Sequence, residues 1–242
     1  MKAIILAAGQ GSRLLPLTAD RPKCLVPVGG KTILEHQLAS LRASGIEDVT
    51  VVGGYRFDRL TEFAERLPAA ERPNLVYNPF FTVSSSIGSV WAARDLLDGP
   101  FCLLNGDSVC EPAALAGVFA SLQPGVSLFV EPLSEPEHDD MLVRAENGRV
   151  IEVAKSLDRA AATHRSVGII ACPDPDGGPY SAALEEVIMG PGGEQRFHHD
   201  IVDLLAHRSK VAAVEFPADA WQEIDSMVDI DRWIGAADNA AA

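Results

Sequence analysis

The chain has 242 residues, of which 47% are hydrophobic and 22% are charged, so it can bury a sizeable core and is not grossly disordered. Its net charge of −14 and sequence pI of about 4.8 argue against nucleic acid and anionic membranes as partners. No stretch approaches the ~20 apolar residues of a membrane span. The apolar run at the start is too short for a signal peptide, so we expect a cytoplasmic protein.

The first 31 residues reverse the sign of the charge. They hold five basic residues against Asp20 alone, whereas the rest of the chain holds 15 basic and 33 acidic residues. Such a local reversal in an acidic protein predicts a small anionic ligand bound near the N-terminal segment. The basic residues are Lys2, Arg13, Arg21, Lys23 and Lys31.

Strands and helices alternate through residue 122. The predicted strands are 3–6, 49–52, 75–77 and 101–104, and the predicted helices are 32–43, 57–67 and 86–97. This alternation predicts a parallel sheet with right-handed crossovers, which binds ligands at the carboxyl ends of its strands. The glycine-rich residues 9–13 and Asp107 both follow strand ends, so we expect them at the same edge.

The pattern changes after residue 125. Four strands joined by turns are predicted at 126–131, 141–144, 149–153 and 166–171, with a hairpin at Asn147-Gly148. A helix at 197–207, a strand at 211–216, the segment 221–225 and a helix at 228–237 follow. We expect this half to be a mixed or antiparallel extension that roofs the site.

The cysteines and the paired histidines lack the spacing of a zinc site. No two cysteines form a C-x-x-C pair, and the side chains of His198 and His199 are expected to diverge because the residues are neighbours. Buried, reduced thiols are expected instead, as suits a cytosolic protein. The cysteines are Cys24, Cys102, Cys110 and Cys172.

A glycine-rich loop follows the first predicted strand. Gly9 and Gly11 would let backbone N–H groups approach phosphates, and Arg13 could bind phosphate oxygens through its guanidinium. The loop is not a dinucleotide fingerprint, because Leu14 stands at the third glycine position, and no Gly-Lys-Ser/Thr follows as in a Walker A loop. By itself the pattern is equally compatible with a plain strand-to-helix turn.

The longer stretch LAAGQGSRLLPLTADRPKCLVPVGGKTILEHQL, residues 6–38, resembles the signature of the nucleotidyltransferases that activate sugar phosphates and small alcohol phosphates. The resemblance continues weakly over the whole length. It implies an α/β fold of the three-layer, Rossmann-like nucleotidyltransferase type, with a mostly parallel sheet and a mixed or antiparallel extension. Residues 1–242 would form one domain, with a nucleotide-binding half at 1–124 and an acceptor-binding half at 125–242.

The resemblance also implies roles for the loop. Arg13 would bind the β- and γ-phosphates, and Lys23 would lie beside the α-phosphate and the incoming acceptor. A solvated surface lysine is the alternative for Lys23. The expected nucleotide contacts in the loop are Leu6, Ala7, Ala8, Gly9, Gly11, Ser12 and Arg13.

Two acidic strings point to a magnesium site. Family members carry a magnesium-binding aspartate just after the fourth predicted strand, and Asp107 stands at that point in this chain. Asn105, two residues earlier, would contact the nucleotide. The alternative for Asp107 is an Asx turn or a helix cap. The string Trp221-Gln222-Glu223-Ile224-Asp225 resembles the W-x-E-I-D segment of choline-phosphate and phosphonate cytidylyltransferases. This implies that Asp225 is the second metal ligand and that Glu223 supports the metal or contacts the acceptor.

Residues 78–89 indicate the nucleotide. Sugar-phosphate members carry a Gln-x-x-Pro-x-Gly-x-Ala-like string here, whereas this chain has an Asn followed by small polar residues, which resembles the cytidylyltransferase branch. We therefore expect CTP. Ser84, Ser85 and Ser86 could bond the base or the acceptor, although a cluster of helix-capping serines is equally compatible.

The acceptor is less constrained. Residues 139–155 resemble the same branch, which implies that Lys155 touches the acceptor phosphate unless it is a surface lysine. Phosphocholine would need an aromatic cage, and a phosphonate fits equally well. The aromatic candidates are Trp91, Tyr180, Trp221 and Phe80 or Phe81. The histidines His138, His198 and His199 could bind a carboxylate or hydroxyl, or be ordinary histidines.

These observations predict a Mg²⁺-dependent cytidylyltransferase that transfers CMP from CTP to a small phosphonate or phosphorylated alcohol and releases pyrophosphate. Its catalytic residues would be Arg13, Lys23 and Lys155. A sugar-1-phosphate uridylyl- or thymidylyltransferase, a non-catalytic nucleotide sensor and a Rossmann oxidoreductase are the rivals. The partners would be CTP and a small anionic substrate, not nucleic acid or membrane, and a homodimer is compatible with the sequence.

Overall fold

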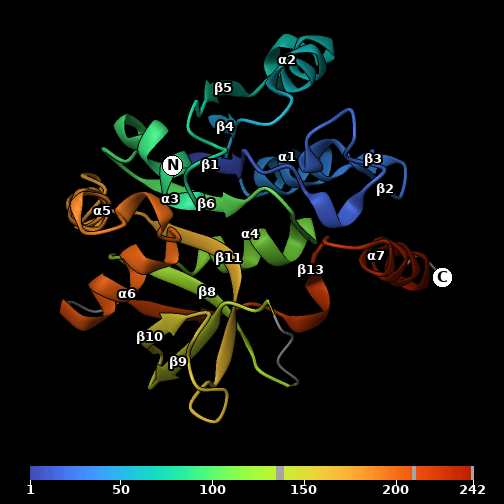
Figure 1. The fold of residues 1–242 in the computed structure, drawn as a ribbon. Helices are drawn as coiled ribbons and strands as arrows, with labels where there is room; N and C mark the ends of the chain where they lie inside the picture. Colours follow the sequence, from blue (N-terminus) through green and yellow to red (C-terminus); the bar gives the residue numbers. More distant parts are fainter. Residues whose placement is uncertain (135–138, 209–210, 241–242) are drawn as a thin grey trace.

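The computed structural model describes residues 1–134, 139–208 and 211–240, and a nine-stranded sheet runs through both halves of the chain (Figure 1). The strand order is β5-β4-β1-β6-β11-β8-β12-β10-β9. The first four form a parallel block: β5 (Asn74–Tyr77), β4 (Val49–Gly53), β1 (Lys2–Ala7) and β6 (Phe101–Asn105). This block confirms the predicted parallel sheet.

The second half adds a mixed extension to that sheet. Strand β11 (His164–Cys172) pairs antiparallel with β6 and with β8 (Ser127–Pro132), while β12 (Ala212–Glu215) runs parallel to β8. The outer hairpin joins β9 (Leu142–Glu146) to β10 (Arg149–Ala154). Its turn residues Asn147 and Gly148 have φ values of 51° and 72°, as a two-residue hairpin turn requires.

Helices cover both faces of the sheet, so the molecule has three layers. One face is covered by α3 (Ser86–Ala92), α5 (Tyr180–Met189) and α6 (His199–Arg208). The other is covered by α1 (Ile33–Ala43), α2 (Phe57–Arg66) and α4 (Pro112–Ala120). Alternating residues of β1 serve both cores, because Ile4 faces the first layer while Ala3 and Ile5 face the second.

A third, smaller core lies beneath the glycine-rich loop. Helix α7 (Met227–Ala240) packs Ile230 and Trp233 against Leu14, Val26 and Ile33. The short elements of this region are η1 (Ser12–Leu14), η2 (Lys23–Leu25), β2 (Pro27–Val28) and β3 (Lys31–Thr32). The end of the chain therefore holds the segment that carries Arg13 and Lys23.

A two-stranded pairing outside the main sheet joins distant parts of the sequence. Strand β13 (Trp221–Glu223) pairs antiparallel with β7 (Ser108–Cys110), with Glu223 opposite Ser108. The N–H of Ile224 then donates to the carbonyl of Asp107 at 3.0 Å. This pairing places the 221–225 segment beside Asp107.

Some elements differ from expectation. The helix predicted over 86–97 ends at Ala92, because Ala93 leaves helical geometry and a tighter turn, η4 (Arg94–Leu96), places Leu97 in the core. Helices α4 and α5 and the short strands β2, β3 and β7 are not among the predicted elements. The remaining short turns are η3 (Ala69–Glu71), η5 (Gly193–Gln195) and η6 (Ala218–Ala220). All four cysteines are buried and unpaired, as predicted. Within the described ranges, no helix is both long enough and apolar enough to cross a membrane.

The buried side chain of Gln37 fixes the turn that carries Asp107. Its Nε2 donates to the carbonyl of Asn105 at 2.6 Å and to that of Ser108 at 2.9 Å. We predict that Gln37→Leu lowers the free energy of unfolding by about 2–4 kcal/mol, since two buried carbonyls lose their donor. Urea denaturation measures the change. The control is Gln123→Leu at the surface, expected within about 0.5 kcal/mol of wild type; equal effects would contradict the assignment.

Candidate functional site

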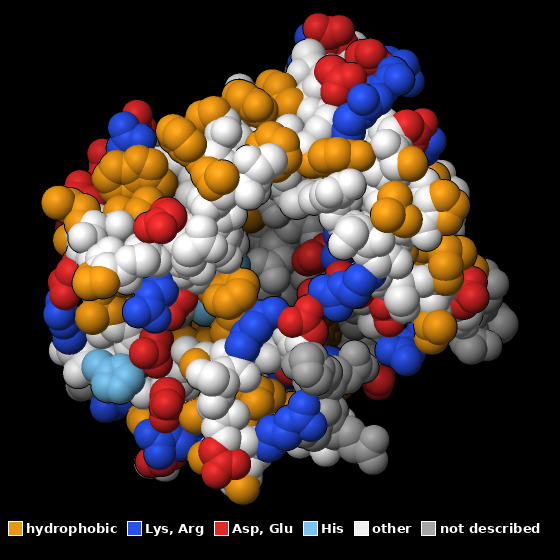
Figure 2. All heavy atoms as spheres, in the orientation of Figure 1, with side chains coloured by type: hydrophobic (Ala, Val, Ile, Leu, Met, Phe, Trp, Pro, Cys, Tyr) orange, Lys and Arg blue, Asp and Glu red, His pale blue; other side chains and the backbone are white. Residues whose placement is uncertain are grey.

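A cavity of about 320 Å³ lies at the carboxyl ends of β1 and β6, where the sequence placed the site. Figure 2 shows this face hollowed near its middle, with acidic and basic side chains around the hollow. Most of the predicted residues line the cavity: Leu6, Ala7, Ala8, Gly9, Arg13, Lys23, Ser84, Ser85, Ser86, Asn105, Asp107, Lys155 and Glu223. Of the others, Gly11 and Ser12 shape the loop, and Asp225 lies at the rim beside Lys23 and Arg13.

The glycine-rich loop is built around the stem of Lys23. Gly11 has φ 68°, and a Cβ there would lie 2.8 Å from the Cβ of Lys23. The hydroxyl of Thr18 donates to the carbonyl of Gly11 at 2.9 Å and holds this turn. Because Gly11 has no side chain, the stem of Lys23 can lie against the loop and extend toward the cavity.

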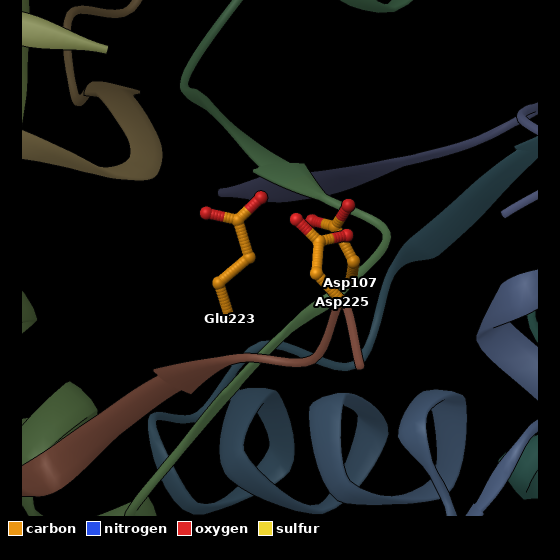
Figure 3. A group of neighbouring side chains, drawn as sticks. All are labelled: Asp107, Glu223 and Asp225. Carbon is orange, nitrogen blue, oxygen red and sulfur yellow. The ribbon is translucent and has the colours of Figure 1, made fainter. Parts of the chain in front are cut away.

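Three carboxyl groups meet at the β7–β13 junction. Oxygens of Asp107, Glu223 and Asp225 lie within 4.8 Å of one another, and Figure 3 shows Asp107 and Asp225 side by side with Glu223 next to them. Asp229 holds the backbone there, because its Oδ2 accepts from the N–H groups of Asp225 at 3.0 Å and of Ser226 at 2.7 Å. Oδ1 of Asp107 is buried without a hydrogen-bond partner.

Two cations from the loop neutralise this cluster. Nζ of Lys23 donates to Asp107 at 2.7 Å and also to Asp225, while Arg13 lies 3.1 Å from Asp225. Burial opposes the charge on Lys23, but the attraction of both aspartates outweighs it and raises the pKa of Lys23. Only 12% of the Lys23 side chain is exposed, so it is not a solvated surface lysine.

The carboxyl group of Glu223 has a strongly shifted pKa. Burial, followed by the negative charges of Asp107 and Asp225, raises the pKa of Glu223 to about 8. The sequence analysis predicts that Glu223 contacts the acceptor or supports the metal ligands from outside. In the structure its carboxyl group lies within the cluster itself. It thus becomes a third candidate ligand for a cation.

Asp139 links the two halves of the chain across the cavity. It forms ion pairs with Arg13, at 2.6 Å, and with Lys155. Nζ of Lys155 also lies 5.0 Å from the ring centre of Phe197. Lys155, the predicted acceptor lysine, therefore faces the same space as the loop cations.

Ser84, Ser85 and Ser86 lie at the start of α3. The structure agrees only in part with the alternative that these serines cap the helix. Ser85 occupies the N-cap position, yet its side chain makes no capping hydrogen bond. The hydroxyl of Ser84 donates to the carbonyl of Phe80 at 2.9 Å. The hydroxyl of Ser86 lies against His198 instead. The three side chains are thus not a simple helix cap.

Several expectations about the site are wrong. The rings of His198 and His199 do not diverge, because their centres lie 4.2 Å apart and both line the cavity. Trp91, Tyr180 and Trp221 do not line it, since packing uses them in or against the core. Phe81 does line it, and Phe80 is exposed elsewhere. Lys2, Arg21 and Lys31 also lie away from the cavity, and His138 lies outside the described residues.

The structure adds residues that the sequence did not single out. Among these lining residues are Asp139, Asp140, Ser166 and Phe197. Asp139 and Asp140 belong to the string that resembled cytidylyltransferases, so that resemblance was a usable signal. Ser166 and Phe197 carried none, since their positions follow from how β11 and α6 pack.

The chain is similar in sequence to known proteins. The profile of the MobA-like NTP transferase domain matches residues 3–142. The chain is 37% identical over 133 residues to CMP-5'-(3-aminopropyl)phosphonate synthase of Streptomyces rubellomurinus, covering 55% of this chain and 21% of that protein. It is 28% identical over 233 residues to 2-aminoethylphosphonate cytidylyltransferase of Lancefieldella rimae, covering 94% and 89%. The chain thus spans about a fifth of the first relative and most of the second.

Solved structures share the fold. The CTP:phosphocholine cytidylyltransferase from Streptococcus pneumoniae superposes with a TM-score of 0.79 at 21% identity, covering 98% of both chains. The inositol-1-phosphate CTP transferase from T. maritima gives 0.78 at 21% identity, covering 94% of this chain and 90% of that one. The predicted nucleotidyltransferase fold is confirmed. With a profile match over more than half of its length, the chain belongs to the MobA-like NTP transferase domain family and is a nucleotidyltransferase.

Proposed function

We propose that the protein is a cytidylyltransferase that transfers CMP from CTP to a small phosphonate or phosphorylated alcohol and releases pyrophosphate. One observation carries the proposal: loop cations and a three-carboxylate cluster converge with Lys155 on one cavity. That is the set of charges needed to hold a triphosphate, a divalent cation and an anionic acceptor together. The names of the relatives from Streptomyces and Lancefieldella favour CTP and a phosphonate.

The two halves of the chain would bind different substrates. Residues 1–124 contribute the glycine-rich loop, the serines before α3 and Asp107, and would bind the nucleotide. Residues 125–242 contribute Lys155 and the 221–225 segment, and would bind the acceptor. The cavity is lined from both halves, which is consistent with one domain.

The carboxylate cluster fits Mg²⁺. Oxygen ligands suit this hard cation, and Asp107 keeps one buried oxygen without a hydrogen-bond partner. The ammonium group of Lys23 already compensates the same carboxylates, so the site is built for positive charge. Asp107 and Asp225, with Glu223, would hold the ion. When bound, Mg²⁺ would neutralise charge on the triphosphate.

The residues support an in-line displacement. An oxygen of the acceptor's phosphonate or phosphate attacks the α-phosphorus, the new P–O bond forms, and the bond to pyrophosphate breaks. No general base is required, because the attacking oxygen is already anionic. Arg13 would bind the β- and γ-phosphates, Lys23 the α-phosphate, and Lys155 the acceptor, so catalysis is positioning and charge neutralisation.

The aromatic side chains favour a phosphonate over phosphocholine. Among the described residues, Phe81 and Phe197 are the aromatic rings, apart from the histidines, that line the cavity. Tyr180 and Trp221 are buried in the cores, and the indole N–H of Trp221 donates to Glu131 at 2.9 Å. Two phenylalanines make a poor cage for a quaternary ammonium, which binds best over Trp and Tyr.

Pyrophosphate release tests the proposal directly. CTP, UTP, GTP, ATP and dTTP are each supplied with Mg²⁺ and a panel of simple phosphonates, phosphocholine and sugar 1-phosphates. We expect turnover with CTP and a phosphonate, because residues 78–89, which include the three serines, resemble the cytidylyltransferase branch. Turnover restricted to a sugar phosphate with UTP or dTTP would contradict it.

Lys23 and Asp107 should respond differently to substitution. Lys23→Ala should reduce kcat about 10²–10³-fold by removing a phosphate ligand, yet tighten Mn²⁺ binding, because Asp107 and Asp225 lose their counterion. Asp107→Asn should lose both activity and Mn²⁺ affinity. Kinetics and Mn²⁺ titration by electron paramagnetic resonance measure the pair, with Lys31→Ala as the matched control. Weaker Mn²⁺ binding in Lys23→Ala would refute the placement.

Metal binding should release a proton. The pKa of Glu223 is raised to about 8, so at pH 7 the carboxyl is mostly protonated, and a cation favours its ionised form. Apparent Mg²⁺ affinity should therefore rise with pH up to about 8 and then level off. Calorimetry in two buffers of different ionisation enthalpy detects the proton, and Glu223→Gln should abolish it. An unchanged heat between buffers for wild type would exclude this linkage.

A further inference from the structure

Two buried histidines line the cavity and take no part in the mechanism above. His198 and His199 stand at the start of α6, each 3% exposed, with ring centres 4.2 Å apart. Each ring has one buried nitrogen without a hydrogen-bond partner, Nε2 of His198 and Nδ1 of His199. Buried polar atoms are normally satisfied, so these two nitrogens are candidates for contact with a ligand.

Ser86 sets the tautomer of His198. Its Oγ accepts from the backbone N–H of His198 at 3.0 Å and lies 2.9 Å from Nδ1 of the same ring. Among the described residues, that Nδ1 is the acceptor within reach of the Ser86 hydroxyl hydrogen. The hydroxyl therefore donates to Nδ1, and in the neutral ring the proton is on Nε2. The free nitrogen of His198 is a donor.

Ser166 does the same for His199 through the opposite nitrogen. Its Oγ accepts from the N–H of Gly168 at 3.0 Å and lies 2.9 Å from Nε2 of His199. When the hydroxyl donates to Nε2, the ring proton is on Nδ1. Both free nitrogens are then donors, and they belong to adjacent rings that line the same cavity.

The surroundings keep both rings uncharged. Burial lowers the pKa of His198 to about 4, in spite of the attraction of Asp107. Burial also lowers the pKa of His199 well below its ordinary value, and His198 and Lys155 add to that effect. Lys155, which would bind the phosphonate, is therefore close enough to His199 for its charge to be felt.

We propose that His198 and His199 form a subsite for an oxygen on the carbon chain of the acceptor, a carboxylate or a hydroxyl, and discriminate against an ammonium group. This rests on the proposed function. An ammonium group carries donors only and leaves two N–H groups facing it unpaired. Nearby carboxylates do not offset this, since Asp107 and Glu223 would hold the divalent cation. Asp139 is shared by Arg13 and Lys155, and Asp140 pairs with Arg165. The chain would thus differ from relatives named for aminoalkyl phosphonates.

The tautomers are measurable without turnover. Long-range ¹H–¹⁵N spectra of the ¹⁵N-histidine-labelled protein should show the proton on Nε2 of His198 and on Nδ1 of His199, with His198→Gln and His199→Asn assigning the signals. Phosphonoacetate with Mg²⁺ should shift both signals, whereas ethylphosphonate should not. The opposite tautomers would overturn the subsite. Unchanged signals with both phosphonoacetate and 2-hydroxyethylphosphonate would overturn it as well.

Acceptor preference gives the second test. With CTP, we compare 2-hydroxyethylphosphonate, phosphonoacetate, 2-aminoethylphosphonate and ethylphosphonate, which differ only in the distal group. For wild type, kcat/KM should be at least about tenfold higher for an oxygen-bearing acceptor than for the amine or ethyl compound. The preferred one of the first two identifies the oxygen as hydroxyl or carboxylate. Preference for the amine would overturn the proposal.

Substitutions separate recognition from folding. His198→Leu and His199→Leu should each lower the ratio of kcat/KM between the oxygen-bearing acceptor and ethylphosphonate about tenfold. His198→Gln and His199→Asn should largely restore it, since each keeps a donor near the free nitrogen. A purely structural role would lower both rates together and leave the ratio unchanged. Absence of turnover with all four acceptors would instead refute a phosphonate as the acceptor in the proposed function, and the tautomer and binding spectra would still decide the subsite.

Discussion

Three carboxyl groups packed within 4.8 Å of one another are the constraint on which the site depends. Like charges at this distance repel strongly unless a cation or a proton compensates them. Here Lys23 and Arg13 supply the cations, and Glu223 holds a proton at neutral pH because its pKa is raised. Gly11 belongs to the same arrangement, since only a residue without a side chain lets the stem of Lys23 pass.

Within the proposed function, these cations would serve both as partners of the carboxylates and as ligands of the substrate's phosphate groups. Arg13, Lys23 and Lys155 are paired with Asp225, Asp107 and Asp139. A triphosphate and a divalent cation would each replace one partner of these pairs. The charges would then exchange counterions, so binding would leave none of them unpaired in the cavity.

The part of the cavity that would bind the acceptor recognises its ligand differently from the part that would bind the metal. The contacts to the distal group of the acceptor rest on neutral groups, because two serines fix the imidazole tautomers and burial keeps the rings uncharged. Neutral, buried donors discriminate because the wrong partner leaves them unpaired. One fold can thus keep its nucleotide chemistry while the distal end of the pocket selects the acceptor.

The sequence by itself determined the alternating strands and helices, the glycine-rich loop at the end of β1, and the acids Asp107 and Asp225, because these follow from local periodicity and short motifs. Tertiary structure decided what those motifs could not. The β7–β13 pairing carried Glu223 into the cluster, Asp139 came to join Arg13 and Lys155, and core packing took Tyr180 and Trp221 away from the cavity. The closely spaced rings of His198 and His199 likewise contact Ser86 and Ser166, which lie far away in sequence. Such contacts form only when the sheet closes, since the spacing of residues along the chain carries no information about which strands become neighbours.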